Sequence, residues 1–119
     1  MTNGFSAYNL TRRRILVTDG RTATTLLSRL WGLIGHEPLR AGQGLLIRPC
    51  QAIHTFGMEF PVDAAFVDHR GCIVRVVSGL RPSRIRPVVL CAVLVIELPE
   101  GMVEATGTRR GNRIAIKVR

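Results

Sequence analysis

The chain has 119 residues, of which 46% are hydrophobic and 21% are charged. This length fits one domain with a core of its own, and this composition excludes a disordered chain. The net charge is +9, and a surface this basic could attract phosphates or acidic partners. The arginines are dispersed along the sequence, however, and this pattern argues against nucleic acid as a dedicated partner.

The cysteines and the apolar runs bear on the compartment. Cys50, Cys72 and Cys91 are odd in number and form no CxxC pair, which fits reduced thiols in a cytosol better than a disulfide scaffold. The N-terminal residues do not have the pattern of a signal peptide. The longest apolar run, residues 88–96, is too short to span a bilayer. We therefore expect a cytoplasmic protein without membrane insertion.

The first part of the chain is expected to contain an arm, a strand and a helix. Residues 1–11 are polar and are expected to form a loose N-terminal arm. Residues 14–17 are expected to form a first strand, with a turn at residues 19–20. Leucines and isoleucines then recur at helical spacing, which predicts one short α-helix over about residues 22–34, with Thr22 as its N-cap.

The rest of the chain is typical of short strands separated by turns. Apolar runs predict strands over residues 45–47, 52–56, 62–67, 72–77, 88–98 and 113–118. Asp68 to Gly71 forms a tight turn between two of these runs, which predicts a hairpin. Cys91 would lie inside a buried strand as a small hydrophobe, and residues 102–106 are expected to make a single helical turn. The pattern predicts one β-rich domain over residues 12–119, a sandwich or barrel with the short helix packed on it.

Several motifs resemble one family of prokaryotic proteins, the domain of unknown function 192. They are RLWGLIG (29–35), GLLIRPC (44–50), IHTFGMEFPVDAAFVDHRG (53–71), VIELPEG (95–101) and GNRI (111–114). The resemblance covers about residues 22–116 and implies a β-sandwich of jelly-roll type with a small helix packed on it. It implies no activity, because the family has none assigned. His36 and Asn112 depart from the arginine and aspartate that members usually carry, so the roles of these two positions stay open.

Polar side chains gather in the central stretch of the chain, and Cys50, His54, Met58 and Asp63 are the candidate ligand-binding residues. The first three are four residues apart, and all can bind soft metal ions such as Cu(I). On a strand, however, four residues span roughly 13 Å, which is too far for one ion. Only a bend at Gly57 could bring two of them together. No metal is therefore assigned.

Two acidic residues accompany apolar strands. Asp63 needs a partner there, which His54 or an arginine could provide. In a structural role Asp63 would fix the turn at Pro61, and in a functional role it would orient a ligand. Glu97 ends a predicted buried strand, and we expect it to pair with an arginine across the sheet.

The favoured function is a small binding module for a small ligand or a protein partner, with its site near His54, Met58 and Asp63. An enzyme is the first alternative, with Cys50 as nucleophile or with the His54/Asp63 pair. No nucleophile elbow and no phosphate-binding glycine motif accompany these residues, so catalysis is not favoured.

Two further alternatives stay open. One is a protein that binds soft metal ions, Cu or Zn, in the central stretch. The other is a protein that binds anions or nucleic acid through the arginines of the basic connection over residues 80–87, which are Arg81, Arg84 and Arg86. No cofactor is expected.

Overall fold

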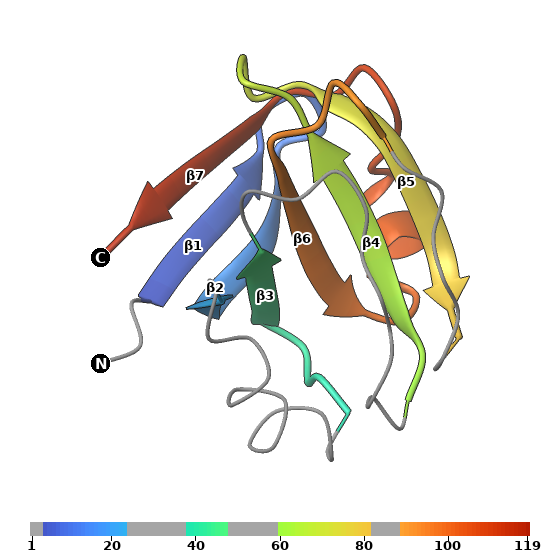
Figure 1. Cartoon of the computed structure of the whole chain (residues 1–119). Helices are drawn as coiled ribbons and strands as arrows, with labels where there is room; N and C mark the ends of the chain where they lie inside the picture. Colours follow the sequence, from blue (N-terminus) through green and yellow to red (C-terminus); the bar gives the residue numbers. More distant parts are fainter. Residues whose placement is uncertain (1–3, 24–37, 48–59, 82–88) are drawn as a thin grey trace.

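A computed structural model describes residues 4–23, 38–47, 60–81 and 89–119. These residues form a curled seven-stranded sheet with the order β5-β4-β6-β3-β2-β1-β7, and a short helix lies against it (Figure 1). The mainly β fold with a short helix is therefore confirmed, but the described helix spans residues 102–106, whereas the helix predicted from the sequence spanned about residues 22–34. The elements are β1 (Gly4–Asn9), β2 (Arg14–Ala23), β3 (Gln43–Ile47), β4 (Val62–Val67), β5 (Ile73–Leu80), β6 (Leu94–Pro99), α2 (Met102–Thr106) and β7 (Ile114–Val118).

The sheet is a half-barrel that closes at one end. Its two edge strands meet where Cys72 and Arg113 form a bridge. Beside this bridge Ile73 donates its N–H to the carbonyl of Asn112, and Ile114 donates to the carbonyl of Gly71, both at 2.8 Å. Beyond the bridge, β5 and β7 diverge (Figure 1). β2 and β3 pair in parallel, whereas the other described pairs are antiparallel.

The N-terminal arm predicted over residues 1–11 is wrong for residues 4–9, which form β1. This strand lies between β2 and β7 and pairs with both. The side chains of Phe5 and Asn9 are fully buried, and Ala7 is nearly so. The polar composition was misleading because side chains alternate along a strand. The inward positions carry Phe5, Ala7 and Asn9.

β2 also continues beyond the strand predicted over residues 14–17. Asp19 and Gly20, predicted to be a turn, pair with Gln43 and Gly44 of β3, and Thr22 pairs with Leu46. Thr22 is therefore a strand residue and not the N-cap of a helix. The partner strand is distant in sequence, so local propensity did not reveal this pairing. The remainder of the predicted helix, residues 24–34, lies outside the described residues, as does the predicted strand over residues 52–56.

The second half of the chain follows the prediction more closely. β4 has the predicted bounds, and the hairpin turn after it is confirmed, since the Asp68 Oδ1 accepts the N–H groups of Arg70 and Cys72 at 2.9 Å. The helical turn over residues 102–106 is α2. The strand predicted over residues 88–98 begins only at Leu94, and Cys91 lies exposed in a turn instead of buried. An apolar run by itself did not distinguish a turn from a strand.

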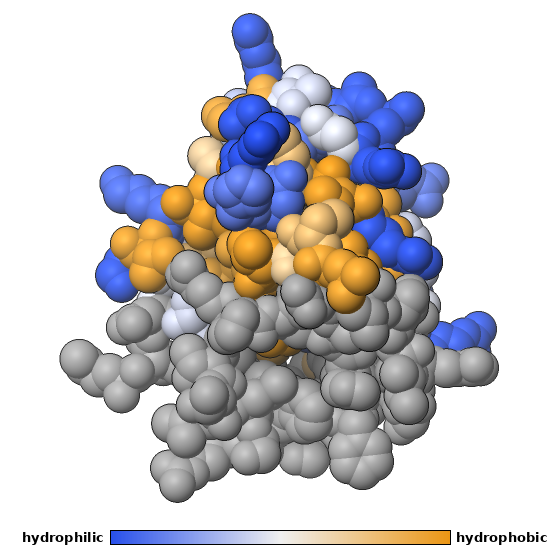
Figure 2. All heavy atoms as spheres, turned by 45° about the horizontal axis from the view of Figure 1, so that its top comes forward, coloured by the Kyte–Doolittle hydropathy of each residue, from blue (hydrophilic) through white to orange (hydrophobic). Residues whose placement is uncertain are grey.

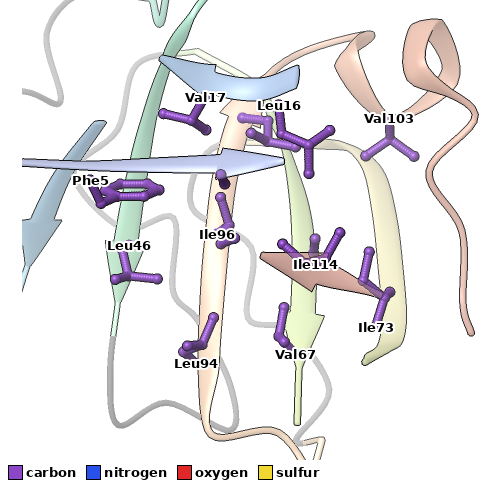
Figure 3. Close-up of a cluster of buried hydrophobic side chains, with 13 residues drawn as sticks. Phe5, Leu16, Val17, Leu46, Val67, Ile73, Leu94, Ile96, Val103 and Ile114 are labelled. Carbon is purple, nitrogen blue, oxygen red and sulfur yellow. The ribbon is translucent and has the colours of Figure 1, made fainter. Parts of the chain in front are cut away.

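Two apolar clusters lie on the two faces of the sheet. The inner cluster contains side chains from all seven strands and from α2, among them Phe5, Leu16, Leu46, Ile73, Ile96, Val103 and Ile114 (Figure 3). The outer cluster lies on β3 to β6 and contains Leu45, Ile47, Phe60, Val62, Ala64, Phe66, Leu80, Ala92 and Val95. Because successive side chains of a strand point to opposite faces, the central strands are buried on both sides.

Gly20 allows the ring of Phe5 to lie against the β2 backbone. A Cβ at Gly20 would lie 2.3 Å from the Cε1 of Phe5, whereas a Cβ at Gly4 would meet nothing closer than 3.5 Å. We expect Gly20→Ala to lower the free energy of unfolding by about 1–3 kcal/mol, because the buried ring must move. Gly4→Ala is the matched control and should change it by less than about 0.5 kcal/mol. Urea denaturation measures both, and equal effects would contradict this account of the packing.

Candidate functional site

Asp63 lies in β4, and its side chain is fully buried. Its Oδ1 accepts the N–H of Gly79 at 2.9 Å. Its Oδ2 accepts the N–H groups of Gly101 at 3.1 Å and Val103 at 2.9 Å. The carboxylate thereby ties β5 and the start of α2 to β4. Among the described residues its partners are three backbone amides and no arginine, and His54, the histidine that we expected, lies outside these residues.

These bonds favour the structural role of Asp63. By the alternation of β4, Asp63 shares a face with Ala65 and Val67, which belong to the inner cluster. Both carboxylate oxygens already accept hydrogen bonds there. Contact between Asp63 and a ligand remains a prediction.

Glu97 lies in β6, and its hydrogen bonding and its position in the sheet both differ from those of Asp63. It is paired with Leu45 of β3 and Ala64 of β4, both members of the outer cluster. Its side chain is 1% exposed, and its Oε1 has no hydrogen-bond partner among the described residues. The part of the chain that the structure describes also gives Glu97 no arginine partner. Arg48, Arg84 and Arg86 lie outside the described residues, so the pairing of Glu97 with an arginine stays a prediction.

Burial determines the charge of Glu97. Removal from water penalises the ionised form and raises the pKa of Glu97 from 4.5 to about 8. At neutral pH the side chain is thus a neutral carboxylic acid, which can donate one hydrogen bond and accept others. Glu97 is thus a single polar group buried among aliphatic side chains. Small-molecule sites have a similar composition, in which a few polar atoms orient a mostly apolar ligand.

The other predicted site residues are distributed as follows. Cys50, His54 and Met58 lie outside the described residues, as do Arg84 and Arg86. Arg81 is exposed and directly follows β5. The described residues contain no group of three His, Cys, Asp or Glu side chains that could hold a metal ion. In the same residues, no helix is long and apolar enough to cross a membrane.

Sequence reasoning missed a buried polar network that joins the two ends of the chain. The Nδ2 of Asn9 donates to the Oγ1 of Thr108 at 2.9 Å and to the Oδ1 of Asn112 at 3.1 Å. The same Oδ1 accepts the N–H of Arg109 at 3.0 Å, and the Oδ1 of Asn9 accepts the N–H of Arg12 at 3.0 Å. Asn112 therefore acts as an acceptor, a role that the usual aspartate could also fill. No local pattern links residues so far apart in sequence.

Comparison of the sequence with known protein families identifies the family of the chain. The profile of the family described as "Uncharacterized ACR" (DUF192) matches residues 9–116. No curated protein matches the chain.

Solved structures show the same fold at low sequence identity. A protein of unknown function from Novosphingobium aromaticivorans DSM 12444 is 16% identical, with a TM-score of 0.75 over 94% of this chain and 83% of that one. A putative transcription regulator from Sinorhizobium meliloti 1021 is 19% identical, with a TM-score of 0.72 over 97% and 93%. A putative exported protein from Burkholderia pseudomallei K96243 is 14% identical, with a TM-score of 0.52 over 98% of this chain and 25% of that one. Identities this low support the fold alone.

Proposed function

The chain belongs to the DUF192 family of uncharacterised proteins, and from this premise we propose that it is a binding module that holds a small ligand at Glu97. The ligand would lie on the outer face of the sheet, where β6 is flanked by β3 and β4. The predicted class of function is kept, but Glu97 replaces Asp63 as the acidic residue that would bind the ligand.

One observation carries the proposal, the buried Oε1 of Glu97 without a partner among the described residues. A buried polar atom that makes no hydrogen bond costs about 1–3 kcal/mol. Such a group is retained at a site where it serves a function more readily than in a core that only needs stability. A ligand with a hydrogen-bonding group would satisfy this atom and recover part of the cost.

The surroundings of Glu97 indicate the class of ligand. Leu45 and Ala64 flank it on the neighbouring strands, and Val95 lies two residues before it on the same face. These side chains suit hydrocarbon, and a neutral carboxyl group suits one hydroxyl or amide group. We therefore propose a small, uncharged, mostly apolar ligand. His54 and Met58 remain predicted members of the site, and a protein partner remains the alternative occupant.

A ligand screen by thermal shift tests the proposal, with wild type beside Glu97→Leu and Glu97→Gln. Each shift is read against the melting temperature of the same variant without ligand, and each hit is repeated by equilibrium dialysis. We expect ligands that bind the wild type to lose binding to Glu97→Leu, because leucine removes both donor and acceptor. Binding to Glu97→Gln should be weaker, because glutamine keeps a carbonyl oxygen but replaces the hydroxyl group of the acid with an amide. Glu104→Gln, at an exposed position of α2, is the control and should bind these ligands as the wild type does.

Two outcomes would count against this site. Hits that bind equally to the wild type and to Glu97→Leu would remove Glu97 from the proposal. A His54→Ala variant that alters no hit would remove His54.

We also propose the cytoplasm as the compartment. The two described cysteines, Cys72 and Cys91, are free thiols, and Cys91 is exposed. An exposed free thiol suits a reducing compartment, because an oxidising one would promote its pairing. Alkylation of a fresh cell lysate before reduction should label Cys91 fully, and oxidised Cys91 would contradict the proposal.

A further inference from the structure

Three turns that are far apart in sequence meet at the closed end of the half-barrel. They are residues 10–13 between β1 and β2, residues 68–72 between β4 and β5, and residues 107–113 between α2 and β7. Arg14, the first residue of β2, directly follows the first of these turns. Leu10 donates its N–H to the carbonyl of Arg113 at 2.8 Å, and Arg113 donates its own to the Oγ1 of Thr11 at 2.9 Å. The bridge between Cys72 and Arg113 joins the turn of residues 68–72 to the other two. We call this surface the arginine end.

The arginine end concentrates positive charge. Its exposed basic side chains are Arg12, Arg13, Arg14, Arg70, Arg109, Arg110 and Arg113. The three turns contain one acidic residue, Asp68, whose Oδ1 already accepts two backbone N–H groups. The positive charge is therefore scarcely offset within these turns.

The backbone beneath these arginines is held in place by buried side chains. Asn9 accepts the N–H of Arg12, and Asn112 accepts that of Arg109. The Nη1 of Arg113 donates to the carbonyl of Arg70 at 3.1 Å and links two of the turns. The guanidinium groups thus project from a fixed framework, which lowers the entropy lost when they bind a partner.

Large aliphatic side chains are exposed at the same end. Leu10 is 46% exposed and lies in the first turn, and Leu90 and Val93 are 78% and 41% exposed in the segment before β6. Val93 donates its N–H to the carbonyl of Val67, directly before the turn of residues 68–72. Figure 2 turns this end forward and shows apolar side chains interspersed among hydrophilic ones. Arginines and exposed aliphatic side chains at one end suit a partner that offers both anionic groups and hydrocarbon.

We propose that the arginine end binds the surface of an anionic lipid bilayer, a function beyond ligand binding at Glu97. Guanidinium groups bind the phosphates of lipid headgroups strongly. Leu10 and Leu90 would enter the boundary between the headgroups and the acyl chains, as the apolar residues of interfacial proteins do. The protein would lie on the membrane without crossing it.

Nucleic acid is the competing partner, since it carries phosphates as well. It offers the exposed leucines no comparable apolar surface. Binding of single strands commonly relies on aromatic side chains that stack on bases. The three turns and residues 89–93 contain no Phe, Tyr or Trp. The combination of arginines with exposed leucines therefore favours the bilayer as the partner.

Co-sedimentation with vesicles tests the proposal. The full chain is mixed with vesicles of phosphatidylcholine alone or of phosphatidylcholine with phosphatidylglycerol, at low and at high salt. We expect binding only to the anionic vesicles, with weaker binding at high salt because salt screens exposed charges. The triple variant Arg13→Gln, Arg109→Gln, Arg110→Gln should lower the partition coefficient roughly 10- to 100-fold.

Two further variants separate the contributions of charge and apolar contact. The control Arg21→Gln, Arg40→Gln, Lys117→Gln removes the same charge from exposed positions outside the arginine end, and it should bind almost as wild type does. The variant Leu10→Ser, Leu90→Ser keeps all charge and should lower the partition coefficient about tenfold.

Three results would overturn the proposal. The first is equal loss of vesicle binding in both charge variants, which would indicate attraction by net charge alone. The second is unchanged binding of the leucine variant. The third is that the wild type does not bind anionic vesicles but binds a DNA duplex, and that the Arg13→Gln, Arg109→Gln, Arg110→Gln variant loses this DNA binding. Because no arm of the experiment depends on Glu97, its outcome is independent of the ligand screen.

Discussion

Replacing Asp63 with alanine is expected to lower the free energy of unfolding by about 3–5 kcal/mol. The side chain is fully buried and accepts the N–H groups of Gly79, Gly101 and Val103. Alanine would leave all three donors without their acceptor. Since these bonds tie β5 and the start of α2 to β4, the loss affects three elements and not a single strand.

Urea denaturation of the two proteins measures this effect, and two variants serve as comparisons. Asp63→Asn keeps the shape but places an amide N–H group against at least one backbone donor, so its loss of stability should be intermediate. Asp19→Ala changes an exposed aspartate of β2 and should cost less than about 0.5 kcal/mol. If Asp63→Ala were as mild as Asp19→Ala, the three bonds would not have the structural role that we assign to them.

Glu97 is expected to make the protein less stable as the pH rises. Below about pH 4.5 its carboxyl group is protonated in both the folded and the unfolded state. Between 4.5 and about 8 only the folded state retains the proton, so the free energy of unfolding falls by about 1.4 kcal/mol per pH unit. Above pH 8 both states are ionised and the decline ends. The full change is on the order of 5 kcal/mol.

Glu97→Gln isolates this effect, because glutamine has a similar shape and cannot ionise. We expect the variant to match wild type near pH 4 and to become steadily more stable than wild type from about pH 4.5 to pH 8. Denaturation of both proteins under reducing conditions across this range measures the difference, in which other titrating groups cancel. Parallel curves for the two proteins would contradict a neutral, buried Glu97.

Asp63 and Glu97 differ in what they contribute to stability. Three backbone N–H groups donate to the Asp63 carboxylate, which thereby stabilises the fold. Glu97 is buried among aliphatic side chains, where a leucine would be expected to pack without a desolvation penalty. Binding sites retain groups that selection for stability alone would remove. Glu97 lowers stability at neutral pH, and this supports its place at the centre of the proposed site.

The sequence by itself determined the elements whose signals are local. The apolar run of β4, the Asp68 to Gly71 turn and the helical turn at residues 102–106 all match the structure. Alternating apolar residues also predicted β7. Each of these signals arises within a few residues, because turn chemistry and side-chain alternation act between near neighbours. Motifs spread over most of the chain likewise sufficed to identify the family.

Only the tertiary structure decided which distant residues meet. Asp19 to Ala23 are strand residues because β3 lies beside them. The environments of Asp63 and Glu97 depend on strands that the sequence does not pair visibly. Dispersed arginines argued against nucleic acid as a dedicated partner and gave no sign of a local basic surface, yet the fold brings seven of them to one end through the contacts of Arg113 with Leu10, Thr11 and Arg70. Non-local strand pairing leaves no periodic signal in the sequence, so the surface it creates becomes visible only in the folded chain.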